Sequence, residues 1–224
     1  MLTQDDKKRM AAKEALRFLP KDGYIGIGTG STVNFFIEEL AAFKEDIRGV
    51  VSTSEQTKTL LLKHGFNILD LNEVTALSVY FDGADEVNSL LQMVKGGGGA
   101  LLAEKVVASV ANNFVCMVDD SKYVPKLGAF AVPVEVLSYA RSMVSRKMVA
   151  LGGRPELRMN YTTEQGNQII DVHSLNLSTP MELENEINQI PGVVENGIFA
   201  KHPANVLVIG RDGGTEVKQL GGFF

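Results

Sequence analysis

The sequence predicts an α/β protein with a mostly parallel sheet, followed by a smaller α+β unit. Short apolar segments alternate with segments of helical apolar spacing through the first half of the 224-residue chain. Such alternation places helices on both faces of a parallel sheet. After about Ala129 the order changes to helix, strand, strand, helix and strand, which is typical of an α+β unit. We therefore expect one domain from residues 1–129 and 203–224, and a second from residues 130–202.

The first domain is predicted element by element. Thr3 is placed to cap a helix that runs to about Leu19, before a break at proline and glycine. A strand at 24–28 then leads into a helix with four apolar residues at helical spacing, Val33, Phe36, Ile37 and Leu40. Further strands are expected at residues 49–52, 67–71, 77–81 and 114–118, and at 205–210, which returns to this sheet. The tail, 221–224, is expected to fray.

The second domain is predicted in the same way. Gly152 and Gly153 stop a helix, and Thr179-Pro180-Met181-Glu182 has the spacing of a capping box with proline at the first helical position. The expected elements are a helix at 138–151, strands at 156–160 and 168–173, a helix that starts at Thr179, and a strand at 193–199.

The composition argues against several kinds of partner. The chain has 22 Lys and Arg against 27 Asp and Glu, a formal charge of −5, without a long run of one sign. This disfavours nucleic acid or an acidic membrane as the main partner, because both reward clustered cations. The single Cys116 indicates a reducing compartment. No apolar stretch approaches the ~18 residues that span a bilayer, and the polar start lacks a signal-peptide centre, so we expect a cytoplasmic protein.

The first candidate site segment follows the strand at 24–28. Thr29, Gly30, Ser31 and Thr32 form a hydroxyl-rich turn that opens a helix, where backbone amides and the positive helix end suit a phosphate or a sugar hydroxyl. The segment matches neither a dinucleotide fingerprint nor a P-loop. A simple helix cap after a tight turn explains it equally well.

The second candidate is the acidic turn Asp82-Gly83-Ala84-Asp85-Glu86, directly after an apolar strand. Ligands bind outside the carboxyl ends of strands in α/β sheets, and glycine and alanine let a ligand approach the backbone. A solvated acidic turn is the structural alternative. Calcium or magnesium is a rival ligand, but the spacing is not that of an EF-hand loop. The three histidines of the chain show no metal-ligand spacing, so we expect no metal and no cofactor.

The third candidate is Lys95 with the glycines 96–99, which leads into a helix that carries Glu104. Four glycines lose much conformational freedom on ordering, and their amides could face an anion. The helical neighbours of Glu104 are apolar, which predicts a mostly buried carboxylate that acts as a base. A carboxylate that answers the helix dipole is the alternative. Lys122 follows another strand and either reaches an anion or is solvated.

Taken together, these segments resemble the ribose-5-phosphate isomerase family of type A. The resemblance covers nearly the whole chain in the right order. The matching segments are Gly28-Thr29-Gly30-Ser31-Thr32, Asp82-Gly83-Ala84-Asp85-Glu86, Lys95-Gly96-Gly97-Gly98, Glu104-Lys105, Ser121-Lys122, Pro133-Val134-Glu135-Val136, Leu151-Gly152-Gly153-Arg154-Pro155 and Ile190-Pro191-Gly192-Val193-Val194.

The resemblance implies a Rossmann-like catalytic domain, a smaller ferredoxin-like domain, and a homodimer or homotetramer. It also implies a metal-independent aldose–ketose isomerase that interconverts ribose 5-phosphate and ribulose 5-phosphate through an enediolate in the non-oxidative pentose phosphate pathway. Glu104 would be the base, Asp82 and Asp85 would handle hydroxyl protons, and Lys95 would lie near the oxyanion. The implied substrate-binding residues are Lys8, Thr29, Gly30, Ser31, Thr32, Gly83, Ala84, Gly96, Gly97, Gly98 and Lys122.

One departure and two alternatives accompany the resemblance. Gly99 stands where relatives often carry a bulkier residue, and we expect it to loosen the loop. A glucosamine-6-phosphate deaminase or phosphosugar lactonase would share the phosphate-binding turn, yet the paired aspartates favour the isomerase. A non-catalytic sugar-phosphate sensor is the other alternative, although no basic helix-turn-helix segment is evident before Tyr24.

Overall fold

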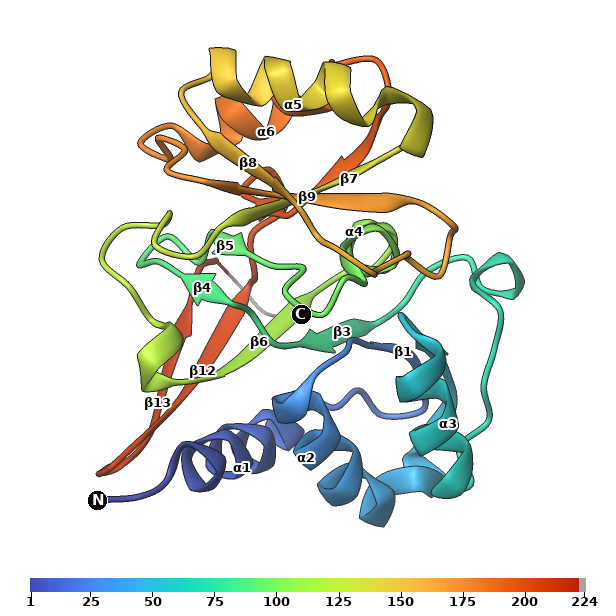
Figure 1. Cartoon of the computed structure of the whole chain (residues 1–224). Helices are drawn as coiled ribbons and strands as arrows, with labels where there is room; N and C mark the ends of the chain where they lie inside the picture. The colour runs from blue at the N-terminus through green and yellow to red at the C-terminus, as the bar shows by residue number, and fades with distance from the viewer. Residues whose placement is uncertain (222–224) are drawn as a thin grey trace. The chain divides into compact units, whose positions relative to one another are not determined.

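Figure 1 shows a computed structural model of the chain, and the structure describes residues 1–221. The expected fraying of the tail therefore concerns residues outside the described part, apart from Gly221. Two compact units emerge, which we call unit 1 and unit 2. Unit 1 comprises Met1–Ala84, Ala103–Tyr123 and the described part of Ala204–Phe224, and unit 2 comprises Asp85–Leu102 and Val124–Pro203. Residues 85–102, expected in the first domain, thus pack within unit 2. The domain boundaries themselves stay a prediction.

Unit 1 is built on a six-stranded sheet in the order β13-β12-β6-β3-β1-β2. All neighbouring strands run parallel except β12 and β13, so the predicted mostly parallel sheet is confirmed, as is the return of the segment near 205–210. The strands are β1 (Gly23–Ile27), β2 (Ile47–Ser52), β3 (Val79–Asp82), β6 (Phe114–Asp119), β12 (Val206–Arg211) and β13 (Gly214–Gln219).

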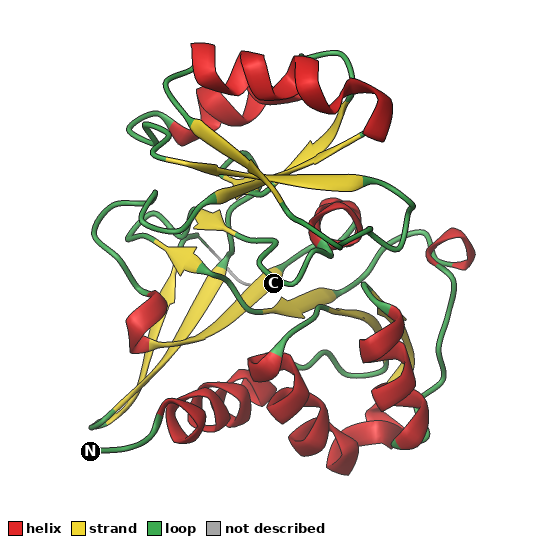
Figure 2. Ribbon diagram, in the orientation of Figure 1, coloured by secondary structure: helices red, strands yellow, loops and turns green. Residues whose placement is uncertain are grey.

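Helices follow the strands of unit 1, as the alternating pattern predicts (Figure 2). The α-helices are α1 (Gln4–Ala15), α2 (Ser31–Leu40), α3 (Glu55–Lys63) and α4 (Leu101–Ser109), which begins in unit 2 and continues in unit 1. The short 3-10 turns are η1 (Leu16–Phe18), η2 (Ala41–Asp46), η3 (Leu71–Glu73) and η4 (Asp120–Lys122).

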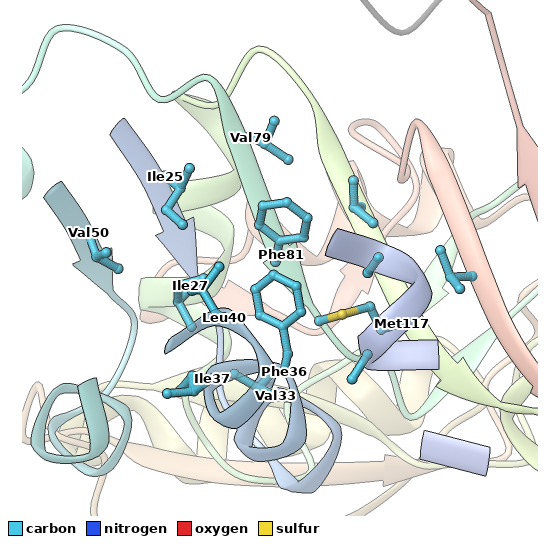
Figure 3. Close-up of a cluster of buried hydrophobic side chains, with 14 of the residues drawn as sticks. Ile25, Ile27, Val33, Phe36, Ile37, Leu40, Val50, Val79, Phe81 and Met117 are labelled. Atoms are coloured by element: carbon cyan, nitrogen blue, oxygen red, sulfur yellow. The ribbon is translucent and has the colours of Figure 1, made fainter. Parts of the chain in front are cut away.

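The main core of unit 1 lies between the sheet and helices α1 to α3. The four apolar residues predicted on α2 are all buried there, and the rings of Phe36 and Phe81 stack with centroids 4.6 Å apart (Figure 3). The opposite face is contacted by Val107 of α4, which lies against Gly26 and Tyr80. Helices therefore contact both faces of the sheet.

Two local predictions for unit 1 have different outcomes. Thr3 caps α1 in a complete capping box with Asp6, as its position predicts. The strand expected at 67–71 is wrong, because this segment makes only one isolated bridge, between Val50 and Ile68. Asp70 then caps the turn η3, which takes the chain out of an extended conformation.

Unit 2 contains a four-stranded antiparallel sheet in the order β10-β7-β9-β8. Its elements follow each other as β-α-β-β-α-β, the ferredoxin-like arrangement, which confirms the predicted smaller α+β unit. The elements are β7 (Val132–Val136), η5 (Ser138–Ala140), α5 (Arg141–Ala150), β8 (Arg154–Leu157), β9 (Gln168–His173), α6 (Pro180–Asn188) and β10 (Val193–Asn196). A small second sheet pairs β4 (Glu86–Val87), β5 (Met93–Val94) and β11 (Ile198–Phe199).

Three details of unit 2 correct the predictions. The strand expected at 193–199 is two strands, β10 and β11, which belong to different sheets. Gly197 lies between them, and there the chain passes so close to the Lys95 carbonyl oxygen that a Cβ would be 2.2 Å from it. Thr179 stands at the N-cap of α6, but no side-chain capping hydrogen bond forms. The strand expected at 156–160 ends at Leu157. Within residues 1–221, the helices are too short or too polar to cross a bilayer.

Candidate active site

Asp82 is the last residue of β3, and its side chain is completely buried. The carboxylate accepts hydrogen bonds from the amides of Thr29 (3.1 Å) and Gly83 (2.7 Å) and from the hydroxyl of Tyr80. A Cβ at Gly28 would lie 1.9 Å from the carboxyl carbon, so only glycine fits there. The carboxylate is therefore held in place at the end of the strand, and it is not part of a solvated turn.

Tyr80 donates to this carboxylate and also lies within the electrostatic influence of Glu104. Burial raises the pKa of the Tyr80 phenol well above its ordinary value, and the negative charges of Asp82 and Glu104 raise it further. Tyr80 therefore remains a hydrogen-bond donor at neutral pH. Glu104, on α4, is 4% exposed, so the buried carboxylate predicted from its apolar neighbours is observed. Two acidic side chains and one phenol thus share a water-poor region of unit 1.

A cluster of hydroxyl groups lies beside Asp82. The Thr29 hydroxyl lies 2.6 Å from that of Ser54 and 3.2 Å from those of Thr53 and Thr57. Thr57 also donates to the carbonyl of Gly28 (2.9 Å). Of these four residues, only Thr29 was predicted as a site residue. The hydroxyl-rich run that follows β2 was a signal for the other three, but only the pairing of β1 with β2 brings the two runs together.

The start of α2 suits an anion. Gly30, with φ 121°, takes the N-cap position, and its lack of a side chain leaves the first turn without a side-chain cap. The first turn contains no acidic residue, unlike those of α1 and α3. Ser31 is exposed and Thr32 is partly buried. The positive N-terminal end of α2 is therefore not neutralised by a carboxylate in its first turn.

Two lysines, Lys122 and Lys8, are the remaining predicted site residues with charged side chains in unit 1. Lys122, partly buried, ends the turn η4 after β6. Asp82 ends β3, while Thr29 and Lys122 come shortly after β1 and β6. Since these three strands are parallel neighbours, all three residues lie at the same edge of the sheet. Lys8 pairs with Asp5 on its own helix at 3.2 Å. The neighbouring Lys7 is engaged by Asp120 (2.9 Å) and Asp212 (3.4 Å).

The remaining predicted site residues belong to unit 2. The Asp85 carboxylate accepts a 2.8 Å hydrogen bond from the amide of Gly97, and a Cβ at Gly97 would lie 2.7 Å from that carboxylate. Lys95 is 3% exposed, and its amine lies 5.5 Å from the centre of the Phe199 ring. Asp85 and Lys95 are thus both attached to the glycine loop 95–99, Asp85 through the amide of Gly97 and Lys95 as its first residue.

The glycine loop is tightly fitted, which corrects the expectation that Gly99 loosens it. Gly99 has φ 83°, and a Cβ there would lie 1.9 Å from the Tyr161 hydroxyl oxygen. Tyr161 donates to the carbonyl of Gly98, and Arg158 donates to the carbonyls of Gly96 and Gly97. The absent side chain at Gly99 is what lets Tyr161 pack against the loop. Neither Arg158 nor Tyr161 was predicted as a site residue.

The predicted site residues therefore fall into two groups, one in each unit. Unit 1 holds Asp82 and Glu104, the binding candidates Lys8, Thr29, Gly30, Ser31, Thr32 and Lys122, and the connecting Gly83 and Ala84. Unit 2 holds Asp85, Lys95, Gly96, Gly97 and Gly98. In the described residues, 1–221, no group of three or more His, Cys, Asp or Glu side chains is arranged to hold a metal ion.

A parallel α/β sheet with buried acidic groups and an uncapped helix N-terminus at one edge is typical of α/β enzymes that act on small polar substrates. Comparison with known proteins specifies the family. The family described as ribose 5-phosphate isomerase A (phosphoriboisomerase A) matches residues 49–214. The ribose-5-phosphate isomerase A of Neisseria meningitidis serogroup C is 57% identical over 217 residues, 97% of both chains.

Solved structures agree. The ribose 5-phosphate isomerase A of Neisseria gonorrhoeae superposes with a TM-score of 0.96 at 56% identity, over 98% of both chains. A D-ribose-5-phosphate isomerase in complex with phospho-erythronic acid gives 0.92 at 37% identity, over 98% of this chain and 100% of that one. The chain belongs to the ribose 5-phosphate isomerase A family. The predicted family, fold class and isomerase class are confirmed.

Proposed function

We propose that the chain interconverts D-ribose 5-phosphate and D-ribulose 5-phosphate as a step of the non-oxidative pentose phosphate pathway. Family membership at 57% identity supports this substrate. The observation that carries the chemistry is the buried Glu104, whose charge acts on the same Tyr80 phenol that hydrogen-bonds to Asp82. A base and a second carboxylate in a water-poor region are what a proton transfer between two adjacent carbons requires.

Glu104 performs the proton transfer between carbons. It removes the proton from C2 of open-chain ribose 5-phosphate, the C–H electrons form the C1–C2 double bond, and the carbonyl oxygen at C1 takes up the negative charge. Transfer of the O2 proton to O1, and return of the carbon-bound proton from Glu104 to C1, give ribulose 5-phosphate with its C2 carbonyl and C1 hydroxyl. A carboxylate shielded from water is suited to both steps, because bulk water does not compete for the proton that it carries between the carbons.

Asp82 and Asp85 move the hydroxyl protons and assist ring opening. They are three residues apart in the chain, and the residues between them are Gly83, which has no side chain, and Ala84, which has a small one, so a sugar can approach the backbone. Lys95 and the amides of the glycine loop stabilise the enediolate oxygens. Each fixed donor aimed at such a developing charge contributes about 3–4 kcal/mol.

The phosphate binds at the start of α2, where Ser31, Thr32 and Gly30 offer amides and hydroxyls, with Lys122 and Lys8 as counter-charges. Lys8 suits this role better than Lys7, since Lys7 is engaged by two aspartates and Lys8 by one exposed aspartate. Thr29 holds a sugar hydroxyl. Binding of the remote phosphate holds the reacting carbons against the base. Phospho-erythronic acid, which is bound in a relative's structure, is expected to bind here as well, with its carboxylate in place of the enediolate.

A direct assay for ribulose 5-phosphate formed from ribose 5-phosphate tests the proposal. Turnover by the purified protein supports it, and binding without turnover would favour a sugar-phosphate sensor. Release of ammonia from glucosamine 6-phosphate, or hydrolysis of a phosphosugar lactone, would favour the other two alternatives. We also propose that the protein acts in the cytoplasm as a homodimer or homotetramer. Its molar mass in solution, measured by light scattering, decides the latter point.

A further inference from the structure

Three successive carbonyl groups of the glycine loop, those of Gly96, Gly97 and Gly98, accept hydrogen bonds from side chains. One guanidinium nitrogen of Arg158 donates to the carbonyl of Gly96 at 3.2 Å and to that of Gly97 at 3.3 Å. The Tyr161 hydroxyl donates to the carbonyl of Gly98 at 3.1 Å. Three successive peptide groups are thus held by two side chains.

This arrangement fixes where the amides of the loop point. In a trans peptide the N–H and C=O groups point in opposite directions, so holding a carbonyl also orients the next residue's amide. The Gly97 amide donates to Asp85 (2.8 Å) and the Gly99 amide to the Gly96 carbonyl (2.9 Å). For the amide of Gly98 no acceptor lies within hydrogen-bonding distance among residues 1–221, and Gly98 is exposed. The exposed Gly98 therefore presents an oriented donor that is available to a ligand.

Arg158 is itself held in place. Two of its nitrogens donate to the two oxygens of Asp171 on β9, at 2.8 and 2.6 Å. Its guanidinium also lies 5.4 Å from the centre of the Tyr161 ring. Arg158 and Asp171 are mostly shielded, with side chains 18% and 22% exposed. This bidentate pair fixes the plane of the guanidinium, and lysine cannot reproduce that geometry.

We propose that Arg158 and Tyr161 are positioning residues that set the peptide planes of the glycine loop. By holding the carbonyl of Gly97, Arg158 keeps the Gly98 amide directed at the oxygen that becomes negative in the enediolate. Tyr161 holds the carbonyl of Gly98, so it fixes the next peptide plane and restricts rotation of the Gly98 backbone. This inference rests on the proposed function, because it assigns the Gly98 amide to that reaction. Such a donor acts mainly in the transition state, so its loss lowers kcat more than it changes KM.

The test compares two variants with matched controls. Tyr161→Phe removes only the hydroxyl, and kcat is expected to fall by about 3- to 10-fold. Arg158→Lys removes the bidentate guanidinium group, and kcat is expected to fall by about 10- to 100-fold. KM is expected to stay within about twofold in both. The controls are Tyr139→Phe, at a residue that is 98% exposed, and Arg154→Lys, at an exposed residue of β8.

Two inhibitors separate positioning from a general loss of structure. Phospho-erythronic acid, whose carboxylate replaces the enediolate, is expected to bind more weakly in both variants, in parallel with kcat. Inorganic phosphate, which occupies only the phosphate site in unit 1, is expected to inhibit all forms equally. If phosphate inhibition and the melting temperature decline together with kcat, the residues are structural and the proposal is wrong. Unchanged kcat and acid binding in both variants would also overturn it. An inactive wild type, by contrast, would refute the proposed function itself.

Discussion

Substitution of Gly28 by alanine is expected to damage both stability and turnover, because the Asp82 carboxyl occupies the space of the missing side chain. The new Cβ would lie 1.9 Å from the carboxyl carbon and 2.0 and 2.4 Å from its oxygens. Ordinary contacts between such atoms are about 3.5–4.0 Å. The carboxylate would have to move by roughly 1.5 Å, which is more than its hydrogen bonds tolerate.

The magnitude follows from the bonds that this displacement breaks. Overpacking alone costs about 1–3 kcal/mol. The carboxylate also loses its hydrogen bonds from Thr29, Gly83 and Tyr80, and a hydrogen bond to a charged group contributes about 1.5–3 kcal/mol. Since such terms are not additive, we expect the free energy of unfolding to fall by about 3–5 kcal/mol in total. Turnover should fall at least ~100-fold if Asp82 transfers protons.

Gly213→Ala is the matched control, because Gly213 is exposed and a Cβ there meets nothing within 4 Å. Its free energy of unfolding should stay within about 0.5 kcal/mol of the wild type. Urea denaturation followed by circular dichroism measures stability, and formation of ribulose 5-phosphate measures turnover. If Gly28→Ala is as stable as the control, the packing argument is refuted. If it is destabilised but turns over normally, Asp82 has no part in proton transfer.

Three further predictions concern the base, the buried phenol and metal ions. Glu104→Gln should leave binding of phospho-erythronic acid largely intact while kcat falls at least ~100-fold; wild-type turnover would remove Glu104 from the mechanism. Because the pKa of Tyr80 is raised by burial and then by Asp82 and Glu104, the folded state keeps a proton that the unfolded chain releases near pH 10. This contribution to stability is complete below about pH 10 and is lost as the pH rises above it, so the unfolding free energy should decline more steeply above pH 10 in the wild type than in Tyr80→Phe. Equal slopes in urea titrations would contradict this. Finally, EDTA should leave turnover unchanged, and a loss restored by a divalent metal would exclude the metal-independent mechanism.

The repeating patterns of the sequence predicted the fold well. The spacing of the apolar residues on α2 is a local property, and all four of them are buried as expected. The burial of Glu104 followed from its apolar helical neighbours in the same way. Both predictions needed only the helical period, which tertiary contacts do not alter.

The missed elements depend on contacts that no local pattern encodes. β7 contains Pro133 and Glu135, two residues that argue against a central strand. Proline is tolerated there because β10 pairs with β7 only from Val134 to Val136, beyond Pro133. β13 alternates between partly buried and exposed residues at the sheet edge, and its polar residues gave no strand signal. Arg158 and Tyr161 were not predicted as site residues for a related reason. Some sixty residues of the chain separate them from the glycine loop with which they form hydrogen bonds.

The acidic turn shows why residue type alone could not assign roles within the site. The structural alternative, a solvated turn, is wrong, because Asp82 is fully buried and Glu86 is 4% exposed. Glu86 accepts hydrogen bonds from the amides of Gly128 (2.7 Å) and Phe130 (2.8 Å), so it fastens a loop of unit 2. Asp82 receives amides from the segments that follow β1 and β3, at the sheet edge where ligands bind. Burying a carboxylate costs several kcal/mol unless hydrogen bonds compensate, and both residues have that compensation. The two carboxylates therefore differ in the position of their donors, which lie at the edge of the parallel sheet for Asp82 and in a loop of unit 2 for Glu86. This position exists only in the folded chain, and it is the reason why the proposed substrate is placed beside Asp82.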